Sequence, residues 1–277
     1  MKKAALILIL VTVAAACWIR VLRAGTEGAS ATAITHPASS YQASSTGSLN
    51  TMRLLAAPNI DGDFSDWPAT DSINVDRVTA YSFSGRIDNP ADLGATVRSG
   101  WDQAHLYFAL RISDDVLVAD STDVWRDDGI ELGIDGLHDK YAWGFDDHQY
   151  TVVVDGRTGD RGIPTTDVIT AVQAYEGGYN IEVAIPLSHL LPGIPDSETV
   201  MGFTIGLHDD DDGGNWDAYL IWEGTNTSSH PEQYGSLVFA DRPEDRLASL
   251  ESRLQQLEQQ LQQLLTILGE FEELPLP

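Results

Sequence analysis

Between about residues 53 and 241, apolar residues recur with a period of two, which is the spacing of a half-buried β-strand. In residues 105–112, HLYFALRI, every second side chain is a large apolar one. Similar short segments follow, separated by stretches rich in Gly, Asp, Asn and Pro that are typical of turns: IELGID, QYTVVVD, VITAVQAY, YNIEVAI, GFTIGLH, AYLIW and SLVF. The only helical hint is the turn PLSHLL. The pattern predicts an all-β fold, an antiparallel β-sandwich of jelly-roll type, over residues 53–241.

The pattern changes to a heptad repeat at residues 244–272, ahead of a short tail, residues 273–277. Arg246 and Arg253 fall at g positions, and Glu251 and Glu258 fall at the e positions five residues later. A parallel partner of the same sequence would therefore pair opposite charges, so we predict a homo-oligomeric coiled coil. A helix folded back on its own sandwich is the alternative, and the number of strands in the coil is left open. Position a is taken by Leu247, Leu254, Leu261 and Leu268, and position d by Leu250, Leu257, Leu264 and Phe271.

The first 23 residues have the composition of an export signal, because MKK precedes the apolar run AALILILVTVAAACWI. Cleavage after the alanines, lipidation at Cys17, or retention as a membrane anchor all remain open, although the run is short against the roughly 20 residues that span a bilayer. Residues 24–52, rich in Ser, Thr, Ala and Gly, are predicted to be a disordered linker. We expect an exported protein of the cell envelope, membrane-anchored or extracellular or periplasmic.

The formal charge of −26 excludes a nucleic-acid partner, because the interaction with a phosphate backbone would be repulsive. An acidic surface suits divalent cations, a salty medium or simply a well-solvated exported protein. Cys17 is the only cysteine, so the sandwich contains no disulfide and depends on its core for stability.

Residues 124–135, VWRDDGIELGID, hold a dense group of candidate site residues. On an extended strand Asp128 falls on the core face, and Glu131 falls on the opposite face between Gly129 and Gly133. Glycines allow close approach to a strand, so we predict an exposed shallow floor with one acceptor carboxylate, beside which Trp125 offers a stacking face. The alternative is that Trp125 packs at the sandwich edge and Glu131 only keeps that face hydrated.

Two acidic runs, DGDFSD and HDDDDGGNWD, offer the hard oxygen ligands that calcium prefers, although neither has EF-hand spacing. Ordinary solvated turns are the alternative for each run. The candidate metal ligands are Asp61, Asp63, Asp209, Asp210, Asp211 and Asp212.

Catalysis is not expected. The adjacent residues Asp127 and Asp128 face opposite ways on a strand, and no second acid pairs with Glu131 as a glycosidase would require. The sequence also contains no G-x-S-x-G motif and no histidine-rich metal set.

Six segments occur in an order that resembles family 9 carbohydrate-binding modules over about residues 56–240: PNIDGDFSDWP, VWRDDGIELGID, DDHQYTVVVD, GGYNIEVAIPLSHL, MGFTIGLHDDDD and PEQYGSLVF. The resemblance implies a β-sandwich with structural calcium, in which the end of a sugar chain is held between two tryptophans beside charged groups. It further implies that Trp125 is one of these tryptophans and that Glu131 is an acidic ligand contact.

The sequence departs from the family at two positions. Thr151 stands near the place of a ligand-binding arginine, and Ser228 stands near the place of the second tryptophan. Losing one stacking face would cost about 0.5–1.5 kcal/mol. Candidate replacements are Trp216, Trp222 or Tyr234 for the aromatic face and Asn226 for the hydrogen-bonding group.

These observations predict a non-catalytic carbohydrate-binding protein, tethered to the envelope and made multivalent by its coiled coil. Two alternatives remain. One is an assembly protein of the envelope that has lost its sugar clamp, and the other is a haem-binding electron-transfer module of the DOMON type using Met201.

Overall fold

The computed structural model describes residues 47–272, apart from residues 78–80, 85–86, 142, 162–166 and 198. The predicted signal or anchor, residues 1–23, lies outside the described residues, as do the tail and most of the predicted linker. None of the helices described in the structure is long and apolar enough to cross a bilayer.

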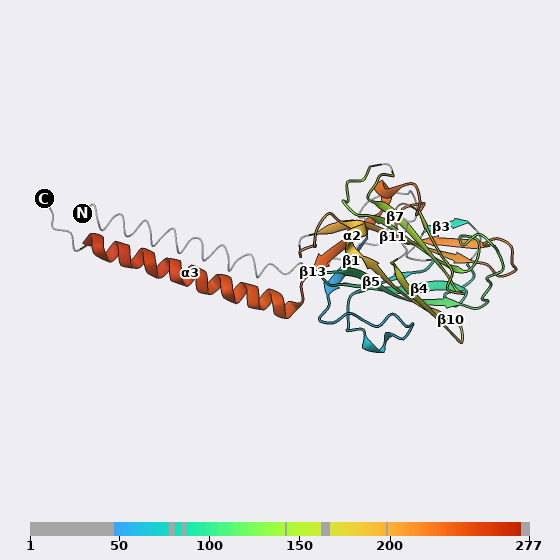
Figure 1. Cartoon of the computed structure of the whole chain (residues 1–277), viewed down its shortest axis with the longest axis horizontal. Helices are drawn as coiled ribbons and strands as arrows, with labels where there is room; N and C mark the ends of the chain where they lie inside the picture. Colours follow the sequence, from blue (N-terminus) through green and yellow to red (C-terminus); the bar gives the residue numbers. More distant parts are fainter. Residues whose placement is uncertain are drawn as a thin grey trace, which may run out of the picture. The chain divides into compact units, whose positions relative to one another are not determined.

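Thirteen strands and few helices form in the described part of the chain (Figure 1). The helical segments are η1 (Phe64–Asp66), α2 (Leu187–Leu190), η2 (Pro231–Gln233) and α3 (Pro243–Glu272). The strands are β1 (Ser48–Arg53), β2 (Ser72–Val75), β3 (Tyr81–Ser84), β4 (Leu93–Trp101), β5 (His105–Asp114), β6 (Gly129–Asp135), β7 (Asp147–Val153), β8 (Thr158–Arg161), β9 (Ile169–Tyr175), β10 (Gly178–Pro186), β11 (Val200–Asp209), β12 (Ala218–Ile221) and β13 (Gly235–Ala240).

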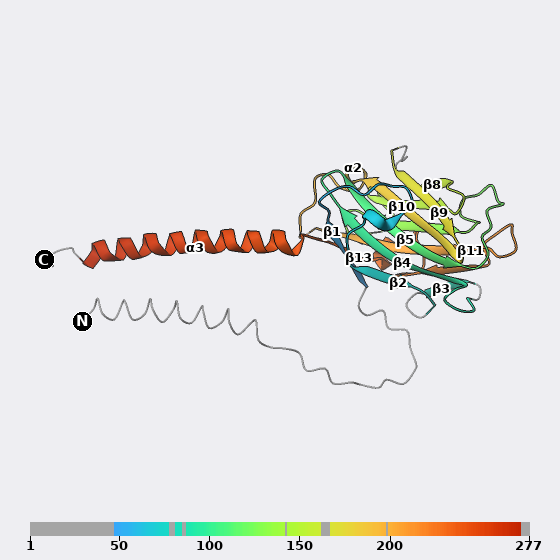
Figure 2. The ribbon, with the colours of Figure 1, turned by 90° about the horizontal axis from the view of Figure 1, so that it is seen from below.

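The strands pair into one curled sheet in the order β8-β7-β6-β11-β13-β1-β4-β5-β10-β9, and Figure 2 shows β4, β5, β10 and β9 side by side. β2 pairs with β4, and β12 pairs with both β11 and β3. All pairs are antiparallel except those of β1, which runs parallel to both β13 and β4. The predicted antiparallel pairing was therefore wrong for β1. A parallel pair needs a long connection between its strands, and most of the domain lies between β1 and β13 in sequence.

The two halves of the curled sheet enclose one hydrophobic core, as the predicted sandwich requires. Phe108 of β5 stacks on Phe203 of β11 with ring centroids 5.1 Å apart. Trp101 of β4 meets Phe239 of β13 edge-on at 5.4 Å. The first contact joins strands that are distant in the order of the sheet, and the second joins β4 and β13 across β1, so the curled sheet closes over its core as an all-β sandwich does.

The outer face of β5 is also buried, which the alternating pattern did not predict. Tyr107 is 3% exposed and Ala109 is 1% exposed, because the segment between β1 and β2 covers them. Trp67 of this segment donates its indole N–H to Glu182 Oε1 of β10 at 2.6 Å. A buried carboxylate that accepts hydrogen bonds thus fixes a covering segment on the sheet.

The first strand and the last helix of the described chain can be compared with the predicted domain boundaries. β1 begins at Ser48, within the stretch predicted to be linker, so the sheet starts five residues before the predicted domain. α3 covers the predicted heptads, and its leucines at positions 247, 250, 254, 257, 261 and 264 are all more than half exposed. A helix with an unpartnered apolar seam is consistent with a coiled coil, but self-association stays a prediction.

Candidate functional site

A cavity of about 410 Å³ opens beside β6, β7, β8, β11 and β12. Three loops complete its wall: residues 115–128 before β6, residues 210–217 before β12, and residues 222–230 after β12. The sequence-predicted residues Trp125, Glu131 and Asn226 all line it. The other lining residues are Val124, Gln149, Thr151, Gly159, Asp160, Arg161, His208, Trp216, Tyr219, Thr227 and Ser228.

Glu131 lies at the base of this cavity. Only 7% of it is exposed, so the predicted open floor is instead a recess. Its Oε2 accepts hydrogen bonds from the hydroxyl of Tyr219 at 2.8 Å and from that of Thr227, and His208 Nε2 lies 3.6 Å away. Burial alone would raise the pKa of Glu131, but His208 and the two hydroxyls outweigh burial and lower this pKa to about 2. Glu131 is therefore a fixed, ionised acceptor, and Oε1 is the oxygen left for a ligand.

The two glycines of β6 do not form the predicted floor for a ligand. A Cβ at Gly133 would lie 2.8 Å from the Tyr234 hydroxyl, and one at Gly129 would lie 2.5 Å from the carbonyl oxygen of Val152. The glycines thus make room for protein neighbours rather than for a sugar ring.

Aromatic side chains from two different loops line the recess. Trp125 is 44% exposed, and the Arg126 guanidinium lies 4.6 Å from its ring centroid. Trp216 is partly buried and lies 6.0 Å from Tyr219, measured between ring centroids. Trp125 and Trp216 thus both line one pocket, and aromatic faces of this kind can stack on sugar rings.

A guanidinium reaches the pocket from β8. Thr151 pairs with Glu131 across β6 and β7 and offers only a hydroxyl, but Arg161 of the next strand lines the same cavity. The Arg161 guanidinium lies 4.4 Å from the Trp143 ring centroid and donates to the carbonyl oxygen of Ser228. The sequence pattern missed Arg161 because β8 is short and polar, with no apolar alternation to mark it as a strand.

Of the remaining predicted ligand residues, Asn226 lies at the pocket, whereas Trp222 and Tyr234 are buried in the protein. Asn226 lines the pocket, but its Oδ1 accepts from the Ser228 amide at 2.7 Å, so the side-chain carbonyl organises its own loop. Trp222 does not line the cavity: it is 8% exposed and packs 5.7 Å from Phe203 in the core. Tyr234 is fully buried beneath β6. The geometry thus gives no ligand face to Trp222, since a core ring cannot stack on a solvent-borne sugar.

Two polar residues that sequence reasoning did not single out also line the pocket. Gln149 donates to Thr227 Oγ1 at 3.0 Å and extends the hydrogen-bond network around Glu131. His208 is 3% exposed, and its buried Nδ1 has no partner among the described residues. The sequence did contain a signal for them, because His208 and Gln149 are polar residues within strands that are otherwise mostly apolar.

Several groups of carboxylates converge outside the pocket, and their members come from segments that are distant in sequence. The run at positions 209–212 divides among these groups, joined by aspartates from the ends of β5 and β6. Within each group, one oxygen per residue lies within 4.8 Å of the others. The groups are Asp114–Asp128–Asp209, Asp92–Asp209–Asp211, Asp120–Asp127–Asp210, Asp210–Asp212–Asp217 and Asp135–Asp139–Asp146.

The group of Asp114, Asp128 and Asp209 is completely buried. Burial and the charges of Asp128 and Asp209 raise the pKa of Asp114 to about 9. Burial together with neighbouring aspartates also raises the pKa of Asp209 to about 8. Asp114 Oδ2 and Asp210 Oδ2 are buried without a hydrogen-bond partner in the described part of the chain. Asp114 Oδ2 belongs to this buried group, and Asp210 Oδ2 belongs to the neighbouring group of Asp120, Asp127 and Asp210; buried carboxylate oxygens without a partner fit a hard divalent cation such as calcium.

The other predicted metal candidates, Asp61 and Asp63, do not join any such group among the described residues. Asp61 Oδ1 accepts from the Asp63 amide at 2.9 Å, and Asp63 Oδ1 caps η1 by accepting from the Ser65 amide at 3.0 Å. Both carboxylates therefore serve as turn and cap acceptors, which is the alternative stated for this run.

Met201, the residue proposed for a haem site, is fully buried in the hydrophobic core at the start of β11. It packs as an apolar side chain, so its position offers no axial ligand.

The comparisons with known proteins agree with this geometry. The sequence profile of the carbohydrate family 9 binding domain-like family matches residues 60–242. The chain is 30% identical over 185 residues to endo-1,4-beta-xylanase A of Thermotoga neapolitana, covering 65% of this chain but 17% of that enzyme. It is 33% identical over 161 residues to endo-1,4-beta-xylanase A of Thermoanaerobacterium saccharolyticum, covering 56% of this chain and 12% of that enzyme.

Solved structures show the same fold. A family 9 carbohydrate-binding module from Caldicellulosiruptor kristjanssonii in complex with cellotriose matches with a TM-score of 0.57 and 20% identity, covering 72% of this chain and 96% of that chain. The xylanases match only in the module region, and family 9 modules are non-catalytic, so this part of the chain is not an enzyme. The resemblance drawn from the six sequence segments is thereby confirmed: the chain belongs to the carbohydrate family 9 binding domain-like family.

Proposed function

We propose that the sandwich binds the end of a β-linked glucan or xylan chain in the pocket beneath Trp125. The observation that carries this proposal is the convergence of two tryptophans, an ionised buried acceptor and a guanidinium on one cavity of about 410 Å³. Apolar sugar faces stack on aromatic rings, and sugar hydroxyls donate to carboxylates or accept from guanidinium groups. The relative solved with cellotriose supports a glucan chain, and the xylanases support a xylan.

Calorimetry of the whole chain against cello- and xylo-oligosaccharides tests this function. We expect Trp125→Ala and Trp216→Ala each to weaken binding by about 2- to 10-fold, the loss of one stacking face. Trp125→Phe and Trp216→Phe keep a ring and serve as matched controls that should retain most of the affinity. Absence of heat with every sugar would contradict the function and favour an assembly role.

The acceptor Glu131 should stay ionised in acid. Its pKa of about 2 lies below the ordinary value of 4.5, so its contribution to stability is complete above about pH 4.5 and is lost only as the pH falls through about 2. An NMR titration of the side-chain carboxyl carbon, assigned by its disappearance in Glu131→Gln, should show no midpoint above pH 3. A midpoint at 4.5 or higher would mean that His208 and the hydrogen bonds from Thr227 and Tyr219 do not stabilise the ionised carboxylate.

We further propose that the converging carboxylates hold structural calcium. Asp114, Asp128 and Asp209 would be the ligands of this site. Bound calcium supplies positive charge that cancels the repulsion among these carboxylates. Through these three aspartates, the bound ion would hold the end of β5, the start of β6 and the end of β11 together.

For the remaining parts of the chain, we propose an envelope tether at residues 1–23 and self-association through α3. The basic start and apolar run support the first. The exposed leucines of α3 and the complementary g and e charges support the second. Oligomers would multiply weak sugar contacts on a polysaccharide surface.

A further inference from the structure

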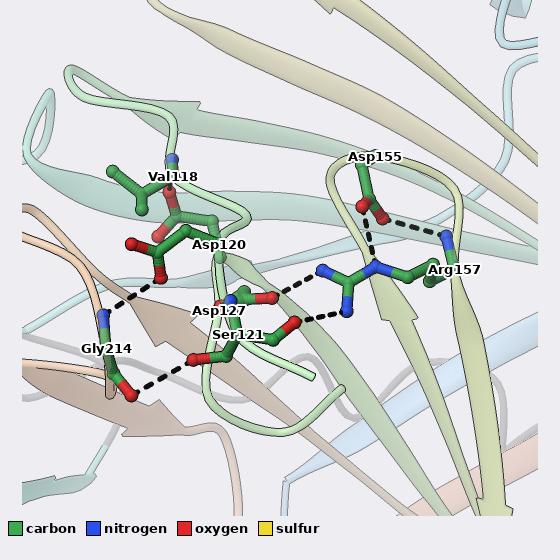
Figure 3. Close-up of polar contacts among 8 residues, drawn as sticks. Val118, Asp120, Ser121, Asp127, Asp155, Arg157 and Gly214 are labelled. Atoms are coloured by element: carbon green, nitrogen blue, oxygen red, sulfur yellow. Dashed lines mark hydrogen bonds and ion pairs between the residues drawn. The ribbon is translucent and has the colours of Figure 1, made fainter. Parts of the chain in front are cut away.

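The two tryptophans of the pocket are carried by loops that have no regular secondary structure at those positions. Trp125 lies in the loop of residues 115–128, and Trp216 lies in the loop of residues 210–217. A stacking wall works only if its ring is held in place before the ligand arrives, because ordering a loop on binding costs affinity. Figure 3 shows hydrogen bonds that join these two loops to each other and to the turn between β7 and β8.

Arg157, from the turn between β7 and β8, binds the first loop at two points and Asp155 of its own turn at a third. Its guanidinium donates to the carbonyl oxygen of Ser121 at 2.7 Å, to Asp127 Oδ2 at 2.5 Å and to Asp155 Oδ2 at 2.6 Å. Asp127 is fully buried, and its Oδ1 accepts from the Ser121 amide at 2.9 Å. Without Arg157 a buried carboxylate would lose its cation, which is strongly unfavourable.

The same loop is joined to the loop of Trp216. Ser121 Oγ donates to the carbonyl oxygen of Gly214 at 3.0 Å, and the Gly214 amide donates to Asp120 Oδ1 at 3.0 Å (Figure 3). Gly214 has a φ of +94° and Gly213 a φ of +89°, and a Cβ at Gly213 would lie 2.5 Å from Asp120 Oδ2. Glycines are therefore required for this close approach.

We propose that Arg157 is a positioning residue for the carbohydrate pocket. Through Ser121 it fixes the Trp125 loop to the Trp216 loop and so sets the relation between the two aromatic walls. We call the contacts of Arg157, Asp127, Ser121, Asp120 and Gly214 the loop clasp. This inference rests on the proposed sugar binding, which it deepens by naming what holds the walls.

The test combines calorimetry with ¹⁹F NMR on the whole chain labelled with 5-fluorotryptophan, in excess calcium. Trp125→Phe and Trp216→Phe assign the two pocket resonances. We expect Arg157→Gln to weaken cello-oligosaccharide binding by about 2- to 10-fold, as for one lost stacking face, and to shift or broaden the Trp125 resonance. Resonances of core residues Trp101 and Trp222 should not move.

Three further variants make the test decisive. Arg157→Lys keeps the charge without the planar fork and should restore binding in part. Ser121→Ala removes only the side-chain bond to Gly214 and should produce a smaller change of the same kind. Arg242→Gln breaks a comparable Arg–Asp pair at the start of α3, where Arg242 donates to Asp245 at 2.7 and 2.9 Å, and should change nothing at the pocket.

The outcomes are distinguishable. If the unaltered chain binds no sugar, the proposed function fails. The Trp125 resonance in Arg157→Gln still tests whether Arg157 positions the Trp125 loop. Unchanged affinity and unchanged resonances in Arg157→Gln would overturn the positioning role. Equal shifts of pocket and core resonances would also overturn it, because Arg157 would then only support the fold.

Discussion

Removing calcium with a chelator is expected to lower the melting temperature of the sandwich by about 5–11 °C. Calcium at 100 times its dissociation constant would stabilise the folded state by about 2.7 kcal/mol, and about 2–4 °C corresponds to each kcal/mol in a domain of this size. The physical reason is that the buried carboxylates of Asp114, Asp128 and Asp209 repel one another when no cation lies between them.

Two variants give this experiment a clear signature. Asp114 has a pKa raised to about 9, so at neutral pH without calcium it is already protonated, and Asp114→Asn should leave the melting temperature in chelator nearly unchanged while it abolishes the response to calcium. Asp61→Asn is the matched control, because Asp61 belongs to an acidic run whose carboxylates cap a turn. Differential scanning calorimetry with and without calcium measures both. A calcium response that vanishes in Asp61→Asn and persists in Asp114→Asn would reverse the assignment of the site.

Deleting residues 243–277 is expected to convert an oligomer into a monomer and to reduce retention on an insoluble polysaccharide by about 10²- to 10⁴-fold, the range that linked binding sites provide. Affinity for a single short oligosaccharide should stay the same, because β13 ends at Ala240 and the pocket is intact. Light scattering measures the mass, and pull-down on the polysaccharide measures the retention.

A milder pair of variants separates the coil seam from the helix itself. Leu254→Asp with Leu257→Asp places charges at a and d, whereas Gln255→Asp with Gln259→Asp places the same charges on the outer face of the helix. Only the first pair should dissociate the oligomer. A monomeric unaltered chain would instead favour a helix that serves another partner.

The sandwich could be predicted from sequence because burial imposes a period of two, and β5 shows how far that holds. Its inward residues were predicted correctly, while Tyr107 and Ala109 were expected to face solvent. They are covered by a segment that folds back from β1, and this contact between distant parts of the chain has no local signal.

Site residues could be predicted where their position follows from the alternation within one strand. They could not be predicted where their position depends on which strands pair. Parity placed Glu131 opposite the core face, but its burial arises from Tyr219 and Thr227 of other segments. Thr151 offers only a hydroxyl, and the guanidinium that lines the pocket belongs to Arg161 on the adjacent strand, which only the strand pairing brings there. The acidic run was found by composition, yet its partners Asp114 and Asp128 come from the ends of other strands.

The parallel pairing of β1 with β13 has a mechanical consequence. Ser48 pairs with Ser236 and Met52 pairs with Ala240, so the chain enters at one end of this strand pair and leaves at the other. A pull between the envelope and a bound polysaccharide lattice, transmitted through the tether and α3, would load these hydrogen bonds in shear, all at once instead of one after another. Resistance to force then depends on the rate of unfolding under load. In the proposed arrangement, the first and last described strands of the sandwich would thus bear the tension between the tether and the coiled coil.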